Sequence, residues 1–269
     1  MKGSGKVSSH RIDLLRPSFV FLASILLAFV LWPLLKTMGG ALGAPLWQTA
    51  IDPEVGRSIL LTLFCSAIAT LIALILGVPL AYLLARYDFR GKPLLEGIIE
   101  LPIVVPHSAA GIALLTVFGR RAPLGRLFEL VGIRFVGTAA GIVIAMLFVS
   151  LPFLVSSARE GFEAVDPRLE RVARTLGATS WIAFRRISLP LAWRAILAGI
   201  VLMWARGISE FGAVIVLAYH PMVAPVLLYE RFESYGLEYA RPVAALMILI
   251  CFAVFAVFRA IIKRRGANG

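Results

Sequence analysis

Cysteine, histidine and acidic residues are scarce in this chain. Its 269 residues include 2 cysteines and 3 histidines, and 15 Asp and Glu stand against 27 Lys and Arg. Cys65 and Cys251 each lie inside an apolar run, which predicts small buried residues and no disulfide. The histidines lie far apart in sequence and no HExxH or CxxC pattern occurs, so the sequence does not support a metal site.

A nucleotide-binding loop is also missing. The segment KGSGKVSS (2–9) has a glycine before a lysine, but a P-loop requires G-x-x-x-x-G-K-[ST]. Val7 follows Lys6, and no glycine stands five residues before Gly5. No nucleophile–base pattern occurs elsewhere, so we expect no catalytic residue and no cofactor bound by this chain. Any work driven by ATP would need a partner subunit.

Long apolar runs dominate the sequence. It is 60% hydrophobic, with a mean hydropathy of +0.90, which excludes an ordinary soluble domain. The first run is as long as a membrane span and no cleavage site follows it, so we expect no signal peptide. The runs are continuous and do not alternate, which favours helices over a barrel. We therefore predict an all-α polytopic membrane protein with six spans at 18–38, 58–86, 98–118, 138–157, 195–218 and 242–262.

The basic residues are distributed unevenly between the two sides of such a protein. With six spans, 18 Lys and Arg fall on the side of the termini, in 1–17, 86–97, 158–194 and beyond 258, and 8 fall on the other. By the positive-inside rule we predict a cytoplasmic N-terminal segment (1–17), a membrane domain (18–262) with a cytoplasmic loop at 158–194, and a cytoplasmic tail (263–269). The same rule accounts for much of the net charge of +12 without nucleic acid.

One external segment does not follow this distribution. The stretch 119–137 would lie outside, yet it has four arginines: Arg120, Arg121, Arg126 and Arg134. The simpler interpretation is a solvated loop. The alternative is a basic patch that attracts an anion or an acidic partner.

The polar loop 158–194 has the pattern of two short amphipathic helices. Asp166 is a candidate N-cap before Pro167, and Gly177 suits the end of the first helix. Apolar residues recur at steps of three and four between these positions. A second helix begins at Thr179 or Ser180. Such a pair suits a groove in another protein; the alternative is a helix pair lying on the lipid surface.

Two apolar runs contain polar residues that are costly in a membrane. Arg206 and Glu210 stand four positions apart in the fifth run, so they share a helix face and can pair, with Ser209 beside them. In ELPIVVPHSAAGIAL (100–114), two prolines flank a bend before His107 and Ser108. All five residues are candidates for a translocation pathway or gate. The alternatives are a structural ion pair, and a histidine bonded to a neighbouring carbonyl.

The cytoplasmic loop resembles the signature loop of ATP-binding-cassette (ABC) importer permeases. That signature reads Glu-Ala-Ala, three residues, Gly, nine residues, Ile-x-Leu-Pro. Gly177 is followed ten positions later by Ile187, and Ala173 agrees with the last alanine, whereas Arg171 stands at the acidic position and Glu170 one residue before it. The resemblance implies that this loop couples to an ATPase subunit, through the residues Glu170, Ala173, Gly177, Ala178, Ile187, Leu189 and Pro190.

Three longer segments are similar to the permeases of molybdate/tungstate importers. They are LPIVVPHSAAGIALL, GFEAVDPRLERVARTLG and WARGISEFGAVIVLAYHPMVAPVLLYERF, and the likeness extends from about residue 55 to 255. It implies the fold of type I ABC importer permeases, and a homodimer in the cell (inner) membrane. It also implies two ATPase subunits that use ATP and an extracytoplasmic oxyanion-binding protein. The alternatives are a sulfate or thiosulfate permease and, more distantly, a stand-alone channel or secondary carrier.

Overall fold

The structure is a computed structural model that describes residues 15–266, without the side chains of residues 15, 44 and 257–266. Residues 1–14 of the predicted N-terminal segment and 267–269 of the predicted tail therefore lie outside the described residues, whereas the backbone of 263–266 continues α13. Within the described part every regular element is a helix, as predicted. The elements are α1 (Leu15–Ala41), α2 (Ala44–Ile51), α3 (Pro53–Arg86), α4 (Lys92–Val104), α5 (His107–Phe118), α6 (Pro123–Leu130), α7 (Ala139–Glu163), α8 (Pro167–Thr175), α9 (Ser180–Ala183), the π-helix η1 (Phe184–Ser188), α10 (Leu189–Ile208), α11 (Gly212–Leu217), α12 (Ala224–Tyr235) and α13 (Leu237–Gly266).

Five helical segments are long and apolar enough to cross a membrane. They are α1, α3, α7, α13 and the continuous helix Ser180–Ile208, which includes α10. The third predicted span is different, because α4 and α5 meet at an angle of 116°. Val105 has an extended backbone and Pro106 follows it, and a residue before proline disfavours the helical conformation. The bend that the two prolines predict within the span 98–118 is thus confirmed, and the described residues contain six spans only if this bent pair counts as one.

The fifth predicted run also differs from a single helix. The helix α10 ends at Ile208, and the short α11 begins at Gly212. The run 195–218 thus contains a break at residues 209–211. Glu210 lies in this break and not on the helix that holds Arg206. Irregular backbone at membrane depth is tolerated where protein covers it or where it lines a cavity.

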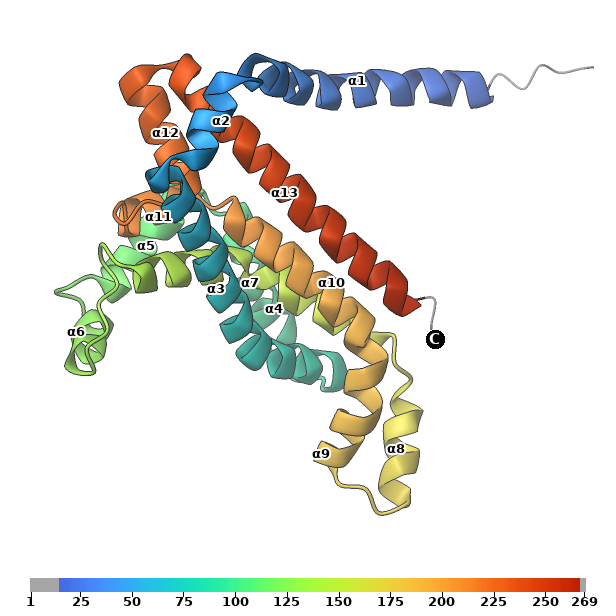
Figure 1. Cartoon of the computed structure of the whole chain (residues 1–269). Helices are drawn as coiled ribbons and strands as arrows, with labels where there is room; N and C mark the ends of the chain where they lie inside the picture. Colours follow the sequence, from blue (N-terminus) through green and yellow to red (C-terminus); the bar gives the residue numbers. More distant parts are fainter. Residues whose placement is uncertain (1–14, 267–269) are drawn as a thin grey trace, which may run out of the picture.

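The helix α7 forms the centre of the bundle, packed between α3 and α10 (Figure 1). Small residues let these helices approach closely. A Cβ atom at Gly161 would lie 2.5 Å from the Cβ of Ala195, and the Ser157 hydroxyl donates to the Ala195 carbonyl at 2.8 Å. Because lipid tails are as apolar as leucine, close packing and such hydrogen bonds stabilise membrane helix pairs.

The two ends of the bundle are built differently. The helices α8 and α9 project from one end, whereas α2 and α12 lie at the opposite end (Figure 1). At the α12 end, the Arg231 guanidinium lies 2.6 Å from Asp52 and 3.1 Å from Glu54, which ties α12 to the start of α3. The hydrogen bond from Arg231 lowers the pKa of Asp52 and outweighs the opposing effect of burial.

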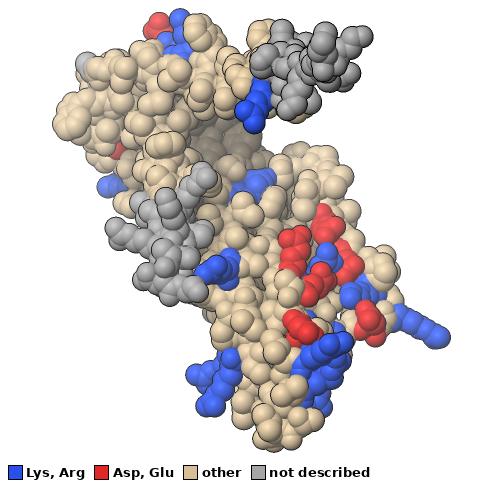
Figure 2. Space-filling model, turned by 90° about the vertical axis from the view of Figure 1, so that its right-hand side faces the viewer, with Lys and Arg blue, Asp and Glu red and all other residues tan. Residues whose placement is uncertain are grey.

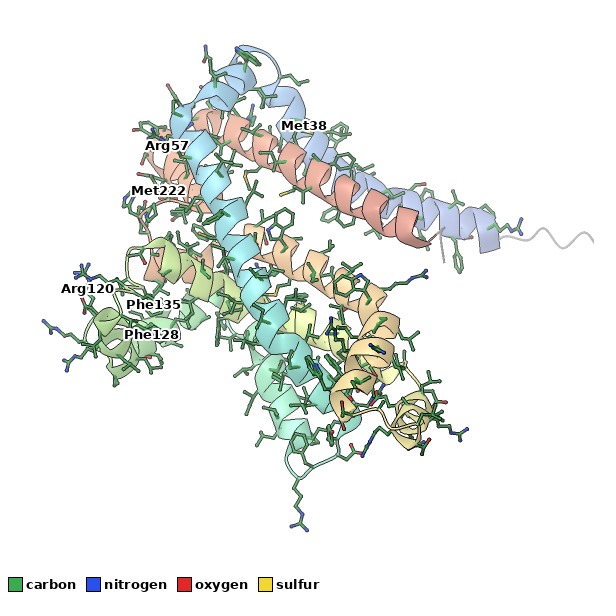
Figure 3. The ribbon with its side chains drawn as sticks, turned by 60° about the horizontal axis from the view of Figure 1, so that its bottom comes forward. Met38, Arg57, Arg120, Phe128, Phe135 and Met222 are labelled. Carbon is green, nitrogen blue, oxygen red and sulfur yellow. The ribbon has the colours of Figure 1, made fainter. Side chains whose placement is uncertain are left out.

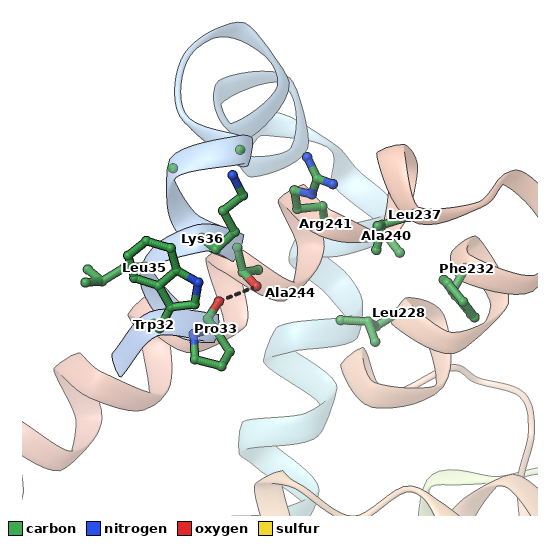
Figure 4. Close-up of a pocket in the computed structure, with 13 residues that line it drawn as sticks. Trp32, Pro33, Leu35, Lys36, Leu228, Phe232, Leu237, Ala240, Arg241 and Ala244 are labelled. Atoms are coloured by element: carbon green, nitrogen blue, oxygen red, sulfur yellow. Dashed lines mark hydrogen bonds between the residues drawn. The ribbon is translucent and has the colours of Figure 1, made fainter. Parts of the chain in front are cut away.

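The helix α1 leans away from the bundle and contacts it mainly through α13 (Figure 1). A cavity of about 810 Å³ lies between α1, α12 and α13 (Figure 4). Its lining is mostly apolar, including Trp32 and Leu228, with Lys36 and Arg241 as its cations. It is separate from the break at residues 209–211 and contains none of the predicted site residues.

Candidate functional site

A polar cluster occupies the break between α10 and α11. Arg206 lies in the last turn of α10, and its Nη2 is 2.9 Å from Oε2 of Glu210. Glu210 is only 1% exposed, and its Oε1 accepts a hydrogen bond from the Ala213 amide at 2.9 Å. The predicted pairing of the two charges is confirmed. The geometry differs from the prediction, because the carboxylate is held by the backbone of α11 and not by a continuous helix.

His107 joins this pair from the bend between α4 and α5. Its Nε2 lies 2.7 Å from Nη2 of Arg206. Because a guanidinium only donates, a hydrogen bond between these two atoms requires the ring nitrogen to accept. The other ring nitrogen lies 3.6 Å from Oε2 of Glu210, which is long for a hydrogen bond. The predicted alternative of a histidine bonded to a backbone carbonyl is not what the structure shows.

Ser209 belongs to the cluster and Ser108 does not. Arg206 Nη1 donates to the Ser209 hydroxyl at 3.2 Å, and that hydroxyl donates to the Arg206 carbonyl at 3.0 Å. The Ser108 side chain is exposed and makes no hydrogen bond within the described residues. Four of the five predicted pathway residues therefore lie together, and only Ser108 lies apart.

Close packing of the two broken helices assembles this cluster. A Cβ atom at Gly212 would lie 2.7 Å from the Cβ of His107, and one at Gly111 would lie 2.9 Å from the Ala213 carbonyl oxygen. The absence of side chains at both glycines thus lets α5 and α11 lie against each other. The Arg206 side chain is partly exposed beside the buried Glu210, at 21% against 1%.

The basic segment 119–137 folds against the outer end of α5. The rings of Phe118, Phe128 and Phe135 pack together, with centroids 4.8–6.4 Å apart. Figure 3 shows Phe128 and Phe135 close to each other and Arg120 beside them at the edge of the molecule. Arg134 pairs with Glu129 at 2.9 Å. The segment is thus an ordered helix-containing loop; whether it binds an anion or a partner stays a prediction.

The second candidate region is the pair α8–α9, whose predicted helix ends are confirmed. Asp166 accepts a hydrogen bond from the Arg168 amide at 2.8 Å, and Thr179 accepts one from the Ile182 amide at 3.3 Å. Gly177 has φ +92°, and the amide of the next residue reaches back to the Ala173 carbonyl at 3.0 Å. This is a Schellman ending, in which glycine avoids the strain of the left-handed conformation.

The region 158–194 is less of a loop than the sequence suggests. The helix α7 continues to Glu163, and α9 runs through η1 into α10 without a gap. Ile187 lies in η1, and Leu189 and Pro190 follow this π-helical turn directly inside the continuous helix Ser180–Ile208. Ala173 and Ala178 are half-buried between the two short helices. The signature positions therefore connect the projecting helices directly to the span that carries Arg206.

Glu170 points into the protein, away from the projecting tip. Its carboxylate accepts hydrogen bonds from the Tyr82 hydroxyl at 2.8 Å, from Arg86 Nε at 2.6 Å and from the Ser188 hydroxyl. Burial raises the pKa of Glu170, but the bonds from Ser188, Arg86 and Tyr82 outweigh this effect and hold the pKa below its ordinary value. Arg86 also donates to the carbonyls of Phe162 and Val165 at 2.8 and 3.0 Å. This network joins α3, α7, α8 and η1.

Sequence reasoning missed Tyr82, Arg86 and Ser188. Arg86 was counted only as a positive-inside residue, although its place in the last turn of a long span was a usable signal. Tyr82 stands one helical turn before it, on the same face. Their partner Glu170 lies more than 80 residues further along the chain, so no local pattern connects them.

Comparison with known proteins identifies the family to which this chain belongs. Residues 73–266 match the family described as "Binding-protein-dependent transport system inner membrane component". The chain belongs to this family. The permease is therefore a multi-pass inner-membrane protein, as the five apolar spanning helices also indicate. Membership of binding-protein-dependent systems argues against the stand-alone channel and the secondary carrier.

Curated relatives cover most of the permease. It is 42% identical over 96% of its length to the "Molybdate/tungstate transport system permease protein WtpB" of Pyrococcus furiosus, of which it covers 99%. It is 44% identical over 82% of its length to the protein of the same name from Thermococcus kodakarensis, of which it covers 84%. It is also 34% identical over 95% of its length to a "Probable sulfate transport system permease protein cysT" of Chlorokybus atmophyticus, of which it covers 90%.

Solved structures share the fold of the permease. A chain from the crystal structure of a bacterial ABC transporter that imports the acidic polysaccharide alginate superposes with a TM-score of 0.74 at 17% identity, covering 94% of the permease and 96% of that chain. A chain of the MetNI methionine ABC transporter gives 0.63 at 15% identity, covering 78% and 95%. The predicted fold of ABC importer permeases is thus confirmed.

The geometry of Gly177 makes a testable prediction about the projecting helices. Space around a Cβ atom there is open, so a side chain costs backbone strain, about 1–2 kcal/mol, and causes no clash. We expect Gly177→Leu to reduce co-purification of the ATPase subunit, and Gly177→Asn to reduce it less, because asparagine tolerates positive φ. Gly91, between α3 and α4, is a matched control, since it has φ +93° and equally open surroundings but lies outside the α8–α9 pair. Equal losses in Gly177→Leu and Gly91→Leu would contradict the prediction.

Proposed function

We propose that this permease is the membrane subunit of an ATP-driven importer of molybdate or tungstate. One observation carries the proposal: four relatives named as molybdate/tungstate permeases are 42–44% identical to it over 80–96% of its length. The cation at the break in the membrane suits such a substrate, because an oxyanion crossing apolar surroundings needs a compensating positive charge.

We further propose the assembly in which the permease acts. Two copies enclose the pathway, two ABC ATPase subunits use ATP, and an extracytoplasmic protein delivers the oxyanion. A structural neighbour of the same fold is described in complex with an alginate-bound periplasmic protein, which supports a partner of this general kind. The excess of basic residues at the α8–α9 end supports cytoplasmic placement of that end and of both termini. No cofactor on the chain itself is part of the proposal.

The proposed mechanism assigns a separate task to each end of α10. At its cytoplasmic end, α8 and α9 dock on the ATPase, and their movement reaches α10 through η1. At its other end, Arg206 faces the pathway, while Glu210 and His107 hold the guanidinium in place. A dianion entering against 100 mV, negative inside, faces about 4.6 kcal/mol. A passive pore would therefore run outward, which is the physical reason for coupling to ATP.

Sulfate or thiosulfate is the second candidate substrate. The observation in its favour is the relative named as a probable sulfate permease, 34% identical over 95% of the chain. We place it second because that identity is lower than the identity to the molybdate/tungstate permeases. Tetrahedral dianions of this kind share charge and shape, so Arg206 alone does not separate them.

The deciding experiment is uptake into vesicles that contain the permease, its ATPase and its binding protein. We expect ATP-dependent uptake of tungstate and molybdate that excess sulfate does not suppress. A parallel sample without ATP serves as the control. Suppression by sulfate would transfer the assignment to the sulfate branch, and uptake without ATP would contradict an ATP-driven importer.

A further inference from the structure

The projecting tip formed by α8 and α9 exposes an apolar surface. Leu169, Val172 and Leu176 lie on one face of α8, and Leu176 is 83% exposed. On α9, Trp181 is 66% exposed and Ile182 lies next to it. An apolar surface that is exposed to water in this way is typical of a contact site for another macromolecule.

Arginines surround this apolar surface. Five of them lie on α8 and η1 and are all exposed: Arg168, Arg171, Arg174, Arg185 and Arg186. Figure 2 shows basic side chains on both flanks of the projecting tip, whose end is uncharged. In the described part of the chain none of the five makes an ion pair. Arg86 and Arg159, nearer the bundle, are by contrast paired with Glu170 and Glu96.

The inward position of Glu170 decides the charge of this surface. Glu170 is the acidic residue of α8, and its carboxylate accepts hydrogen bonds from Tyr82, Arg86 and Ser188 inside the protein. The face that α8 presents to a partner is therefore apolar, and the charged residues beside it within the helix are arginines. The helix is about 14 Å long, at about 1.5 Å per residue, so its tip stands well away from the bundle.

We propose that the ATPase subunit receives this tip in an apolar groove whose rim carries carboxylates facing the arginines of α8. This inference rests on the proposed function, because it takes the ATPase subunit as the partner. Complementary charge at the rim of an interface accelerates association and suppresses wrong partners. The rim then provides selectivity, so that the permease accepts an ATPase with matching acids and rejects one with a neutral or basic rim.

Binding of the purified ATPase to the full-length permease tests the proposal. The variants are R171E/R174E, R171Q/R174Q and R171K/R174K, and Arg90→Glu is the matched control because it is an exposed arginine at the same end outside the tip. We expect charge reversal to weaken binding about tenfold or more at about 0.1 M salt, neutralisation to weaken it less, and lysine to keep most of it. The differences should shrink at about 1 M salt.

The outcomes separate this inference from the proposed function. If R171E/R174E bound the ATPase as tightly as the unaltered permease does, the proposed carboxylate rim would be contradicted. Equal losses of affinity in the glutamine and glutamate variants that do not depend on salt would also contradict it. Rescue of R171E/R174E by an acid-to-arginine change at the ATPase groove would support it directly. If the unaltered permease showed no binding and no ATP-dependent uptake, the proposed function itself would fail.

Discussion

Replacing Arg206 with glutamine should lower oxyanion uptake at least about tenfold while the ATPase subunit still co-purifies. The first reason is electrostatic: Glu210 is 1% exposed and loses the guanidinium 2.9 Å away. Removing one partner of a buried ion pair costs about 3–5 kcal/mol. The second reason is functional, since the partly exposed Arg206 is the cation that we assign to the pathway. Uptake into vesicles and thermal unfolding of the purified permease measure the two effects separately.

The double variant R206Q/E210Q distinguishes a pathway residue from a structural one. It removes both charges, so no buried carboxylate is left without a cation, and thermal stability should largely return. Uptake should remain low, because the pathway still lacks its positive group. Full recovery of uptake would show that the pair is only structural. Arg57→Gln, an exposed arginine at the start of α3, is the control and should change neither measurement.

Replacing Glu170 with alanine should uncouple the α8–α9 pair from the membrane helices. Glu170 and Arg86 have side chains 13% and 7% exposed, and their atoms lie 2.6 Å apart. The alanine leaves a buried guanidinium without its carboxylate, at a cost of about 3–5 kcal/mol. We expect more ATP hydrolysed per oxyanion transported, and faster cleavage by trypsin at the exposed arginines of α8. Glu170→Gln keeps a hydrogen-bond acceptor without the charge, so its ATP consumption per oxyanion and its cleavage rate should lie between those of the unaltered permease and those of the alanine variant.

The matched control for Glu170 is Glu163→Ala. Glu163 is more exposed and lies 3.7 Å from Arg159, which keeps its closer partner Glu96 at 2.7 Å. Unchanged coupling and protease resistance are expected there, because an exposed pair contributes little. If Glu170→Ala behaved like this control, the network would not transmit the movement of the tip.

The pH dependence of the Glu170 contribution follows from its lowered pKa. A carboxyl group whose pKa in the folded protein lies below its ordinary value of 4.5 stabilises the folded state fully above that value. The stabilisation is lost as the pH falls through the lowered pKa. At neutral pH the contribution is complete, so the effect of Glu170→Ala should be large at pH 7 and diminish in strong acid.

Local signals predicted the projecting helices well. Asp166, Gly177 and Thr179 occupy the helix ends where the sequence placed them, because capping depends on hydrogen bonds within a few residues. The same locality explains the errors. The prolines indicated a bend before His107, but an apolar run gives the same signal whether its helix is continuous or broken, so the size of that bend and the end of α10 at Ile208 were not predicted.

The sequence by itself determined that the chain is an all-helical membrane protein and that α8 ends at a glycine. It also predicted that Arg206 and Glu210 can pair, since four residues separate them, although Glu210 lies beyond the end of the helix that holds Arg206. Only the tertiary structure decided that His107 joins that pair and that Glu170 turns inward to Arg86. These partners lie 99 and 84 residues apart in the chain. Hydropathy and capping act over one or two helical turns, whereas the partner of a buried charge depends on which distant helices pack beside it.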